Sequence, residues 1–184
     1  MQIGTFRASH SVMRAVPRVV NGTVITRTIL RARRRPKSYP TLVRRVEPAV
    51  LEWINCATDW PDVSVGEARV LIFETPLPNG ATFFVRLWSE PRMPLLCEIP
   101  SGIQDDALRG ALTGMARWRP QQAGMTIEGS AQNFFSRIPI DSELLKGAAA
   151  AFVLEMFVDC IGYKGHTPLV ATLAHEDRTG SSVH

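Results

Sequence analysis

The side chains that most often carry out catalysis or hold metals are sparse and widely spaced in this sequence. The histidines are His10, His166, His175 and His184, and the cysteines are Cys56, Cys97 and Cys160. There is no CxxC pair and no cysteine and histidine at ligand spacing, so the pattern favours neither a zinc site nor a disulfide framework. The triplet His175–Glu176–Asp177 stands in a polar C-terminal stretch that we expect to be solvated. We therefore expect no metal and no cofactor.

Short motifs that mark common enzyme classes are also absent from the sequence. No GxSxG, GxxxxGK or GxGxxG occurs. These are the usual local signs of nucleophilic hydrolysis and of nucleotide chemistry. The sequence therefore predicts a non-enzymatic binding protein.

Charge is distributed unevenly along the chain. Residues 1–45 carry 11 of the 21 basic side chains and none of the 17 acidic ones. Residues 46–184 therefore hold the other 10 basic and all 17 acidic groups, a net charge of −7. This asymmetry predicts a basic N-terminal arm, residues 1–45, joined to an acidic body.

The positive charge of the arm is densest in the run LRARRRPKSYP, residues 30–40. One interpretation of such a run is a solvated, flexible segment, and a second is contact with nucleic acid or another anionic partner. The side chains that would make this contact are Arg31, Arg33, Arg34, Arg35 and Lys37.

The arm has a third interpretation, because an arginine-rich segment without acidic residues is typical of an organelle transit peptide that is later removed. Such a peptide needs an amphipathic helix, and Pro17 interrupts the early segment. Asn21–Gly22 lies between β-branched runs and predicts a short β-hairpin instead. The three interpretations of the arm stay open.

The first half of the body predicts one helix and three strands. Residues 47–60 have apolar side chains at helical spacing, and Pro48 suits the first helical position. Strands follow at 68–75, 81–89 and 94–100, and the first two are joined by a tight hairpin turn.

The second of these strands has two unlike faces. One face carries Phe83, Val85 and Leu87, and the other carries Phe84, Arg86 and Trp88. Successive side chains of a strand point to opposite sides of the sheet. Only one of these two sets therefore faces the helices.

The second half of the body predicts a helix, two strands and a last helix. Ser101 and Gln104 form a capping box for a helix over 101–120, and strands follow at 125–129 and 132–140. The last helix, 141–163, is capped by Asp141 and is apolar around nearly its whole circumference. Either the sheet curls around this helix or a second subunit covers it.

The predicted element order is α-β-β-β-α-β-β-α, which indicates an α+β fold of two layers, an antiparallel sheet with helices on one face. The basic arm precedes this domain, which spans residues 46–163. Residues 164–184 are assigned to a C-terminal tail, in which 168–173 is suited to one more short strand.

The order of these elements and the run IPIDSELLKGAAAAFVLEMF, residues 138–157, carry a resemblance to a known family. Residues 45–163 resemble the small fold of type III secretion chaperones and of the related YbjN-like domains. The resemblance implies a homodimeric binding module that holds an extended or partly unfolded polypeptide on the outer surface of its sheet and helices. The long basic arm departs from the family pattern and speaks against a role in secretion.

Phe84, Trp88 and Arg86 between them are the candidate residues for contact with such a partner. An exposed strand edge accepts a partner strand, while alternate side chains of the partner dock in apolar pockets. The alternative is that these aromatic rings belong to the ordinary core.

The longest apolar run, residues 148–158, contains Glu155 and is shorter than the roughly 20 residues that span a bilayer. We therefore expect no membrane partner and a soluble, cytoplasmic protein. Import into an organelle stays an alternative.

Overall fold

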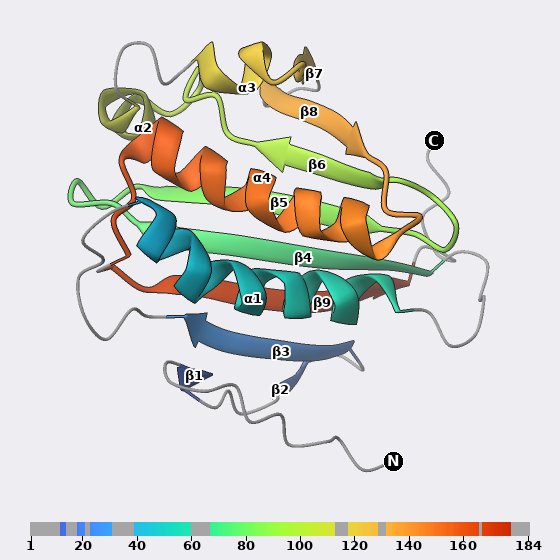
Figure 1. Ribbon diagram of the computed structural model, residues 1–184. Helices are drawn as coiled ribbons and strands as arrows, with labels where there is room; N and C mark the ends of the chain where they lie inside the picture. Colours follow the sequence, from blue (N-terminus) through green and yellow to red (C-terminus); the bar gives the residue numbers. More distant parts are fainter. Residues whose placement is uncertain are drawn as a thin grey trace.

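The structure, a computed structural model, is an antiparallel sheet with helices packed on it (Figure 1). It describes residues 12–13, 18–20, 23–30, 39–59, 67–112, 118–128, 132–165 and 167–177. The strands are β1 (Val12–Met13), β2 (Arg18–Val20), β3 (Thr23–Leu30), β4 (Glu67–Pro76), β5 (Thr82–Ser89), β6 (Leu95–Ile99), β7 (Thr126–Glu128), β8 (Asn133–Ile138) and β9 (Leu169–Asp177). The helices are α1 (Tyr39–Thr58), α2 (Asp106–Ala111), α3 (Arg119–Gln122) and α4 (Glu143–Ile161).

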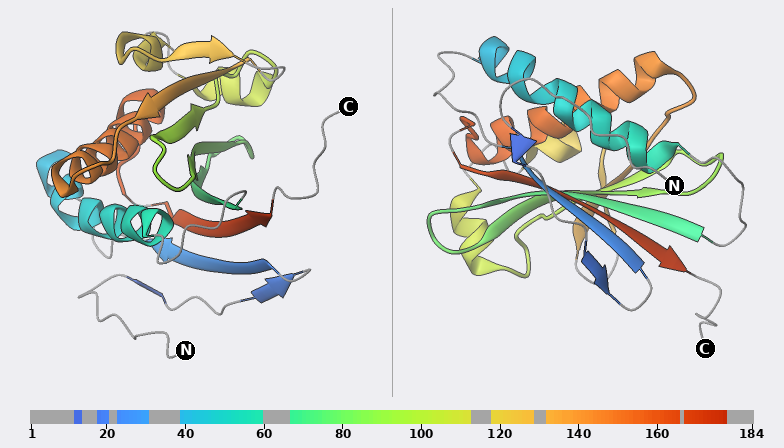
Figure 2. Two further views of the ribbon diagram at one scale, coloured as in Figure 1. Left: turned by 90° about the vertical axis from the view of Figure 1, so that its right-hand side faces the viewer. Right: turned by 90° about the horizontal axis from the view of Figure 1, so that it is seen from below.

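The strands lie in the order β1-β3-β9-β4-β5-β6-β8-β7, β2 also pairs with β3, and all pairs are antiparallel. The two long helices, α1 and α4, lie side by side on one face of this sheet (Figures 1 and 2). The predicted α+β fold of two layers is therefore confirmed.

The core fills the space between the sheet and the two long helices. From β5, Phe83, Val85 and Leu87 are fully buried there. The ring of Phe83 meets that of Phe157 on α4 edge-on, with 5.2 Å between the centroids. Burying a side chain of this size stabilises a fold by about 1.5–3 kcal/mol. The apolar face of β5 thus anchors the helix layer.

Helix α1 begins earlier than the sequence pattern predicts, at Tyr39 rather than near Pro48. Leu42 and Val46 are buried and extend the apolar stripe by two turns toward the N-terminus. Pro48 lies inside the helix and is exposed, so its ring meets solvent. Residues 39–45, which the charge pattern assigned to the arm, are therefore part of a core helix.

The chain after α4 returns to the middle of the sheet. Strand β9 lies between β3 and β4, and its residues Leu169, Ala171 and Leu173 are buried in the core. Thr75 on β4 donates a hydrogen bond to the carbonyl of Pro168 at 2.9 Å, just before β9 begins. The predicted short strand over 168–173 is thus longer and central. His175–Asp177 are paired through their backbone with β4 rather than free.

The pairing of β2 with β3, with Val20 opposite Thr23, is that of the hairpin predicted around Asn21–Gly22. Those two turn residues lie outside the described residues. Strand β3 in turn pairs with β9. Part of the segment assigned to the arm is therefore hydrogen-bonded to the main sheet.

The helix predicted over 101–120 is wrong, because the described part of this stretch holds two short helices, α2 and α3. Gly102 has a left-handed φ of +71°, which ends helical geometry after Ser101. The N-cap of α2 is Asp105, whose carboxylate accepts a hydrogen bond from the backbone of Leu108 at 2.9 Å. Pro120, expected to stop a helix, lies in the first turn of α3, where it costs no hydrogen bond.

Helix α4 is covered on its core side within one chain. Its cap is Ser142 rather than Asp141, and the hydroxyl of Ser142 accepts from the backbone N–H of Leu145 at 3.3 Å. Seven side chains of α4 are buried, namely Ala149, Ala150, Val153, Leu154, Met156, Phe157 and Cys160. Arg119 ties α3 to α4 through ion pairs with Glu155 at 2.7 Å and Asp159 at 2.8 Å.

Within the part of the chain that the structure describes, no helix is long and apolar enough to cross a membrane.

Candidate functional site

The second face of β5 lies on the side of the sheet away from α1 and α4, because Phe83, Val85 and Leu87 take the helix side. Phe84, Arg86 and Trp88 are half-buried on this outer face. Strand register adds Glu98 of β6 opposite Arg86 and Phe135 of β8 opposite Glu98. We call Phe84, Arg86, Trp88, Glu98, Asn133 and Phe135 the outer-face cluster.

Arg86 is at the centre of the outer-face cluster. Its Nη1 donates to Glu98 Oε2 at 2.8 Å, and Glu98 Oε1 accepts from Asn133 Nδ2 at 2.7 Å. The guanidinium carbon lies 5.0 Å from the centre of the Phe84 ring and 5.3 Å from that of Trp88. Cation–π contact at such distances contributes about 0.5–1 kcal/mol at exposed sites. The cation is therefore held in place by contacts within the protein.

The Arg86 side chain keeps 34 % of its surface exposed, whereas that of Glu98 keeps 7 %. A guanidinium has five N–H donors in a fixed plane, and one of them is used by Glu98. A buried carboxylate beneath a partly exposed cation orients that cation outward. The arrangement is suited to hydrogen bonding with carbonyl or carboxylate oxygens of a ligand.

Aromatic surface extends the cluster across three strands. The rings of Trp88 on β5 and Phe135 on β8 are nearly parallel, with 6.5 Å between centroids and an angle of 24°. Exposed Arg137 of β8 lies opposite Leu96 of β6, which in turn lies opposite Trp88. The outer face thus combines flat apolar rings with two arginines.

The structure brings together the three predicted contact residues of β5 and adds neighbours that the sequence analysis missed. Glu98, Asn133 and Phe135 come from strands that are distant in sequence, so no local pattern points to them. Phe84 and Trp88 do not belong to the core between sheet and helices. The predicted anion-contact residues Arg31, Arg33, Arg34, Arg35 and Lys37 lie outside the described residues.

The cysteines do not have the environment of a nucleophile. Burial raises the pKa of the Cys97 thiol, and it raises the pKa of the Cys160 thiol to about 12. The pKa of the Cys56 thiol is also raised, although this residue is more exposed than the other two. A nucleophilic cysteine needs the opposite shift. Among the described residues, no three His, Cys, Asp or Glu side chains gather where a metal would bind.

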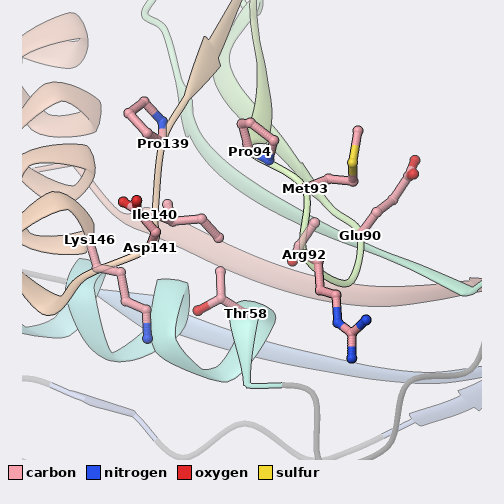
Figure 3. Close-up of a pocket in the computed structure, with 10 residues that line it drawn as sticks. Thr58, Glu90, Arg92, Met93, Pro94, Pro139, Ile140, Asp141 and Lys146 are labelled. Atoms are coloured by element: carbon pink, nitrogen blue, oxygen red, sulfur yellow. The ribbon is translucent and has the colours of Figure 1, made fainter.

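A pocket of about 430 Å³ lies on the helix side of the sheet, where α1 ends and α4 begins (Figure 3). Its apolar wall comes from the turn after β5 and the loop after β8, through Met93, Pro94, Pro139 and Ile140. Thr58, the last residue of α1, lines it from below, and its hydroxyl donates to the carbonyl of Ile54 at 2.9 Å. A pocket of this size suits a small molecule or a chain end.

Four charged residues line the same pocket, Glu90, Arg92, Asp141 and Lys146. The turn before β6 closes through a 3.2 Å hydrogen bond from Met93 N–H to the Glu90 carbonyl. Arg92 takes the left-handed position of this turn, with φ of 63°. The sequence analysis missed this pocket. Pro91 and Pro94, which flank Arg92 and Met93, are the local signal of a rigid turn there.

No protein-family model matches this chain, and no curated protein and no solved structure matches it with significant similarity.

Proposed function

We propose that this protein is a non-enzymatic binding module that holds an extended polypeptide segment across the outer face of its sheet. The observation that carries the proposal is the outer-face cluster, in which aromatic rings and an anchored arginine lie on the face opposite the two long helices. Rigid aromatic side chains and arginines are the residue types that dominate protein interfaces.

The edge of the sheet supports the same proposal. Strand β7 pairs with only the first half of β8, so Ser136, Arg137 and Ile138 have no β7 partner. An extended peptide that pairs with this part of the edge, which no described strand covers, gains backbone hydrogen bonds, and its side chains on the outer face lie beside Arg137 and approach Phe135. Main-chain pairing provides affinity, and the rings provide selectivity for apolar side chains.

The resemblance to type III secretion chaperones and YbjN-like domains points in the same direction. It rests on the element order predicted from the sequence, to which the structure adds β3 and β9, and on residues 138–157, and it implies a homodimer that holds an unfolded or extended partner. A binding role of this kind needs neither a metal nor a nucleophile.

Selection from a display library of random peptides tests this proposal. We expect the protein to enrich peptides with apolar residues at alternate positions. Trp88→Ala and Phe84→Ala should raise the Kd of a selected peptide about tenfold or more, because each removes a ring from the contact surface.

The matched control is Leu144→Ala on α4, which also removes an exposed apolar side chain but on the helix side. It should leave the Kd of the selected peptide unchanged. Circular dichroism establishes that each variant folds. Equal enrichment by the parent and by Trp88→Ala would rule out the outer face as the binding surface.

A second candidate function is binding of single-stranded nucleic acid. The observation that favours it is the aromatic surface with Arg86 and Arg137, since bases stack on exposed rings and phosphates pair with arginines. The basic run of the arm would supply further phosphate contacts.

Anisotropy of a labelled single-stranded oligonucleotide at several salt concentrations tests this second candidate. Binding should weaken steeply with salt, and joint substitution of Arg33, Arg34 and Arg35 by Gln should reduce the log–log salt slope by about 2. Arg44→Gln, exposed on α1, is the control and should change the slope less. Absence of binding at low salt would eliminate this function.

A further inference from the structure

The pocket between the end of α1 and the start of α4 contains an arginine in an unusual backbone conformation. Arg92 has φ of 63°, in the turn position where glycine or asparagine is normally found. Residues held in this region at a cavity are frequently part of a binding site. Glycine would adopt this backbone conformation without strain, so the turn itself does not require the side chain of Arg92.

The guanidinium of Arg92 is available for a ligand. Among the residues that the structure describes, Arg92 has no hydrogen bond or ion pair, although it lines a pocket of about 430 Å³. Lys146 enters the same pocket from the first turns of α4, and its Nζ lies 2.8 Å from Glu143 Oε1. The Lys146 side chain is 20 % exposed, so most of its stem packs against the protein.

The two cations bracket one part of the pocket. In Figure 3 the side chains of Arg92 and Lys146 extend on either side of Thr58, whereas the carboxylates of Glu90 and Asp141 point away from this gap. Ile140 points toward the gap and gives it an apolar wall. Arg92 therefore brings a cation without a described counter-ion to the gap, whereas the ammonium group of Lys146 is shared with Glu143.

We propose that this pocket binds a carboxylate that carries a short apolar body, with the carboxylate between Arg92 and Lys146 and the apolar body against Ile140 and the neighbouring prolines. Guanidinium and carboxylate form paired, charge-assisted hydrogen bonds. Glu90 and Asp141 limit the total negative charge that the site accepts, so a singly charged carboxylate fits better than a doubly charged phosphate. The source is either a free aliphatic acid or the C-terminal residue of a polypeptide.

This site is separate from the outer-face cluster and does not depend on the proposed function. The pocket includes Ser89, which lies on the helix side of β5 with Leu87 and Val85. The outer-face cluster lies on the other side of the same strand. The two sites are therefore tested by separate experiments.

The test is to titrate the full-length protein with three probes and to measure binding by backbone NMR chemical shifts and by calorimetry. The probes are hexanoate, the N-acetylated dipeptide Ala-Leu with a free carboxylate, and the same dipeptide as its C-terminal amide. The two acids should shift the signals of Thr58, Arg92 and Lys146, and the amide should not. Tighter binding of the dipeptide acid identifies a chain end as the ligand, and tighter binding of hexanoate identifies a free acid.

Arg92→Gly is the decisive variant, because glycine accepts the left-handed φ and the fold is expected to keep or raise its Tm. We expect it to weaken binding of the acid about tenfold or more, the usual effect of losing a charge-assisted hydrogen bond. Arg44→Gln, an exposed arginine on α1 that belongs neither to this pocket nor to the outer-face cluster, is the matched control and should bind as the parent does. Equal binding of acid and amide, full affinity in Arg92→Gly, or tighter binding of inorganic phosphate than of either acid would each overturn the proposal.

Discussion

Arg86 and Arg92 show how the surroundings of a residue decide what the same side chain is able to do. Arg86 is anchored by a buried carboxylate and two aromatic rings, so its position is set within the protein. Arg92 is placed by its backbone alone, among the residues that the structure describes. The first arginine forms part of a prepared surface, and the second is positioned for a ligand.

The buried thiol of Cys160 predicts a loss of stability at alkaline pH. Burial and the neighbouring Asp159 raise the pKa of this thiol from 9.0 to about 12. The unfolded chain therefore loses the proton first, and the contribution of Cys160 to the free energy of unfolding is complete below pH 9 and is lost as the pH rises toward 12. We expect urea denaturation over this range to show a falling free energy of unfolding.

Cys160→Ala isolates the contribution of this thiol. In this variant the free energy of unfolding should fall less steeply with pH, by up to about 1.4 kcal/mol per pH unit. Part of the pH dependence should remain, because burial also raises the pKa values of Cys97 and Tyr163. The same slope in parent and variant would contradict the assignment.

At the scale of elements, α1 makes the clearest prediction because its first turns were assigned to the arm. Leu42 is 2 % exposed in the core, in a segment that the charge pattern places outside the domain. Leu42→Ala should therefore lower the free energy of unfolding by about 2–4 kcal/mol through lost burial and a residual cavity. Chemical denaturation measures this directly.

Arg44→Ala is the control, since Arg44 lies on the same first turns of α1 as Leu42 but is exposed. It should change the free energy of unfolding by less than about 0.5 kcal/mol. If both substitutions had the same small effect, residues 39–45 would belong to the arm after all.

At the scale of the whole molecule, the exposed side of α4 predicts a homodimer. The core side of the helix is covered within the chain, but Leu144 and Ala148 remain exposed on its outer side. A neighbouring copy that covers this apolar stripe would remove it from water. We expect light scattering to give twice the mass of one chain.

Leu144→Asp should shift this mass toward that of a single chain, because a dimer would bury an unpaired carboxylate. Arg137→Gln on the outer face should leave the mass unchanged. A parent protein that scatters as a single chain at all accessible concentrations would refute the dimer.

Much of the fold follows from local pattern. Alternation along β5 predicts its two faces, because side chains of a strand point to opposite sides whatever the strand pairs with. The apolar run of α4 predicts a helix buried on more than one side; within one chain seven of its side chains are buried, and Leu144 and Ala148 are exposed. The capping box at Ser101 predicted the wrong helix start. Gly102 has a left-handed φ, which is incompatible with a helix there, and the N-cap of α2 is Asp105.

By itself, the sequence determined the α+β class, the inward and outward sets of β5 and the charge contrast between the N-terminal segment and the rest. The central place of β9, the early start of α1, the partners of Arg86 and the pocket beside Arg92 were decided only by the tertiary structure. The physical reason is the same in each case. Local patterns record which side of an element is apolar, whereas strand order and pockets depend on contacts between segments far apart in the chain, such as Thr75 with Pro168 or Arg86 with Glu98.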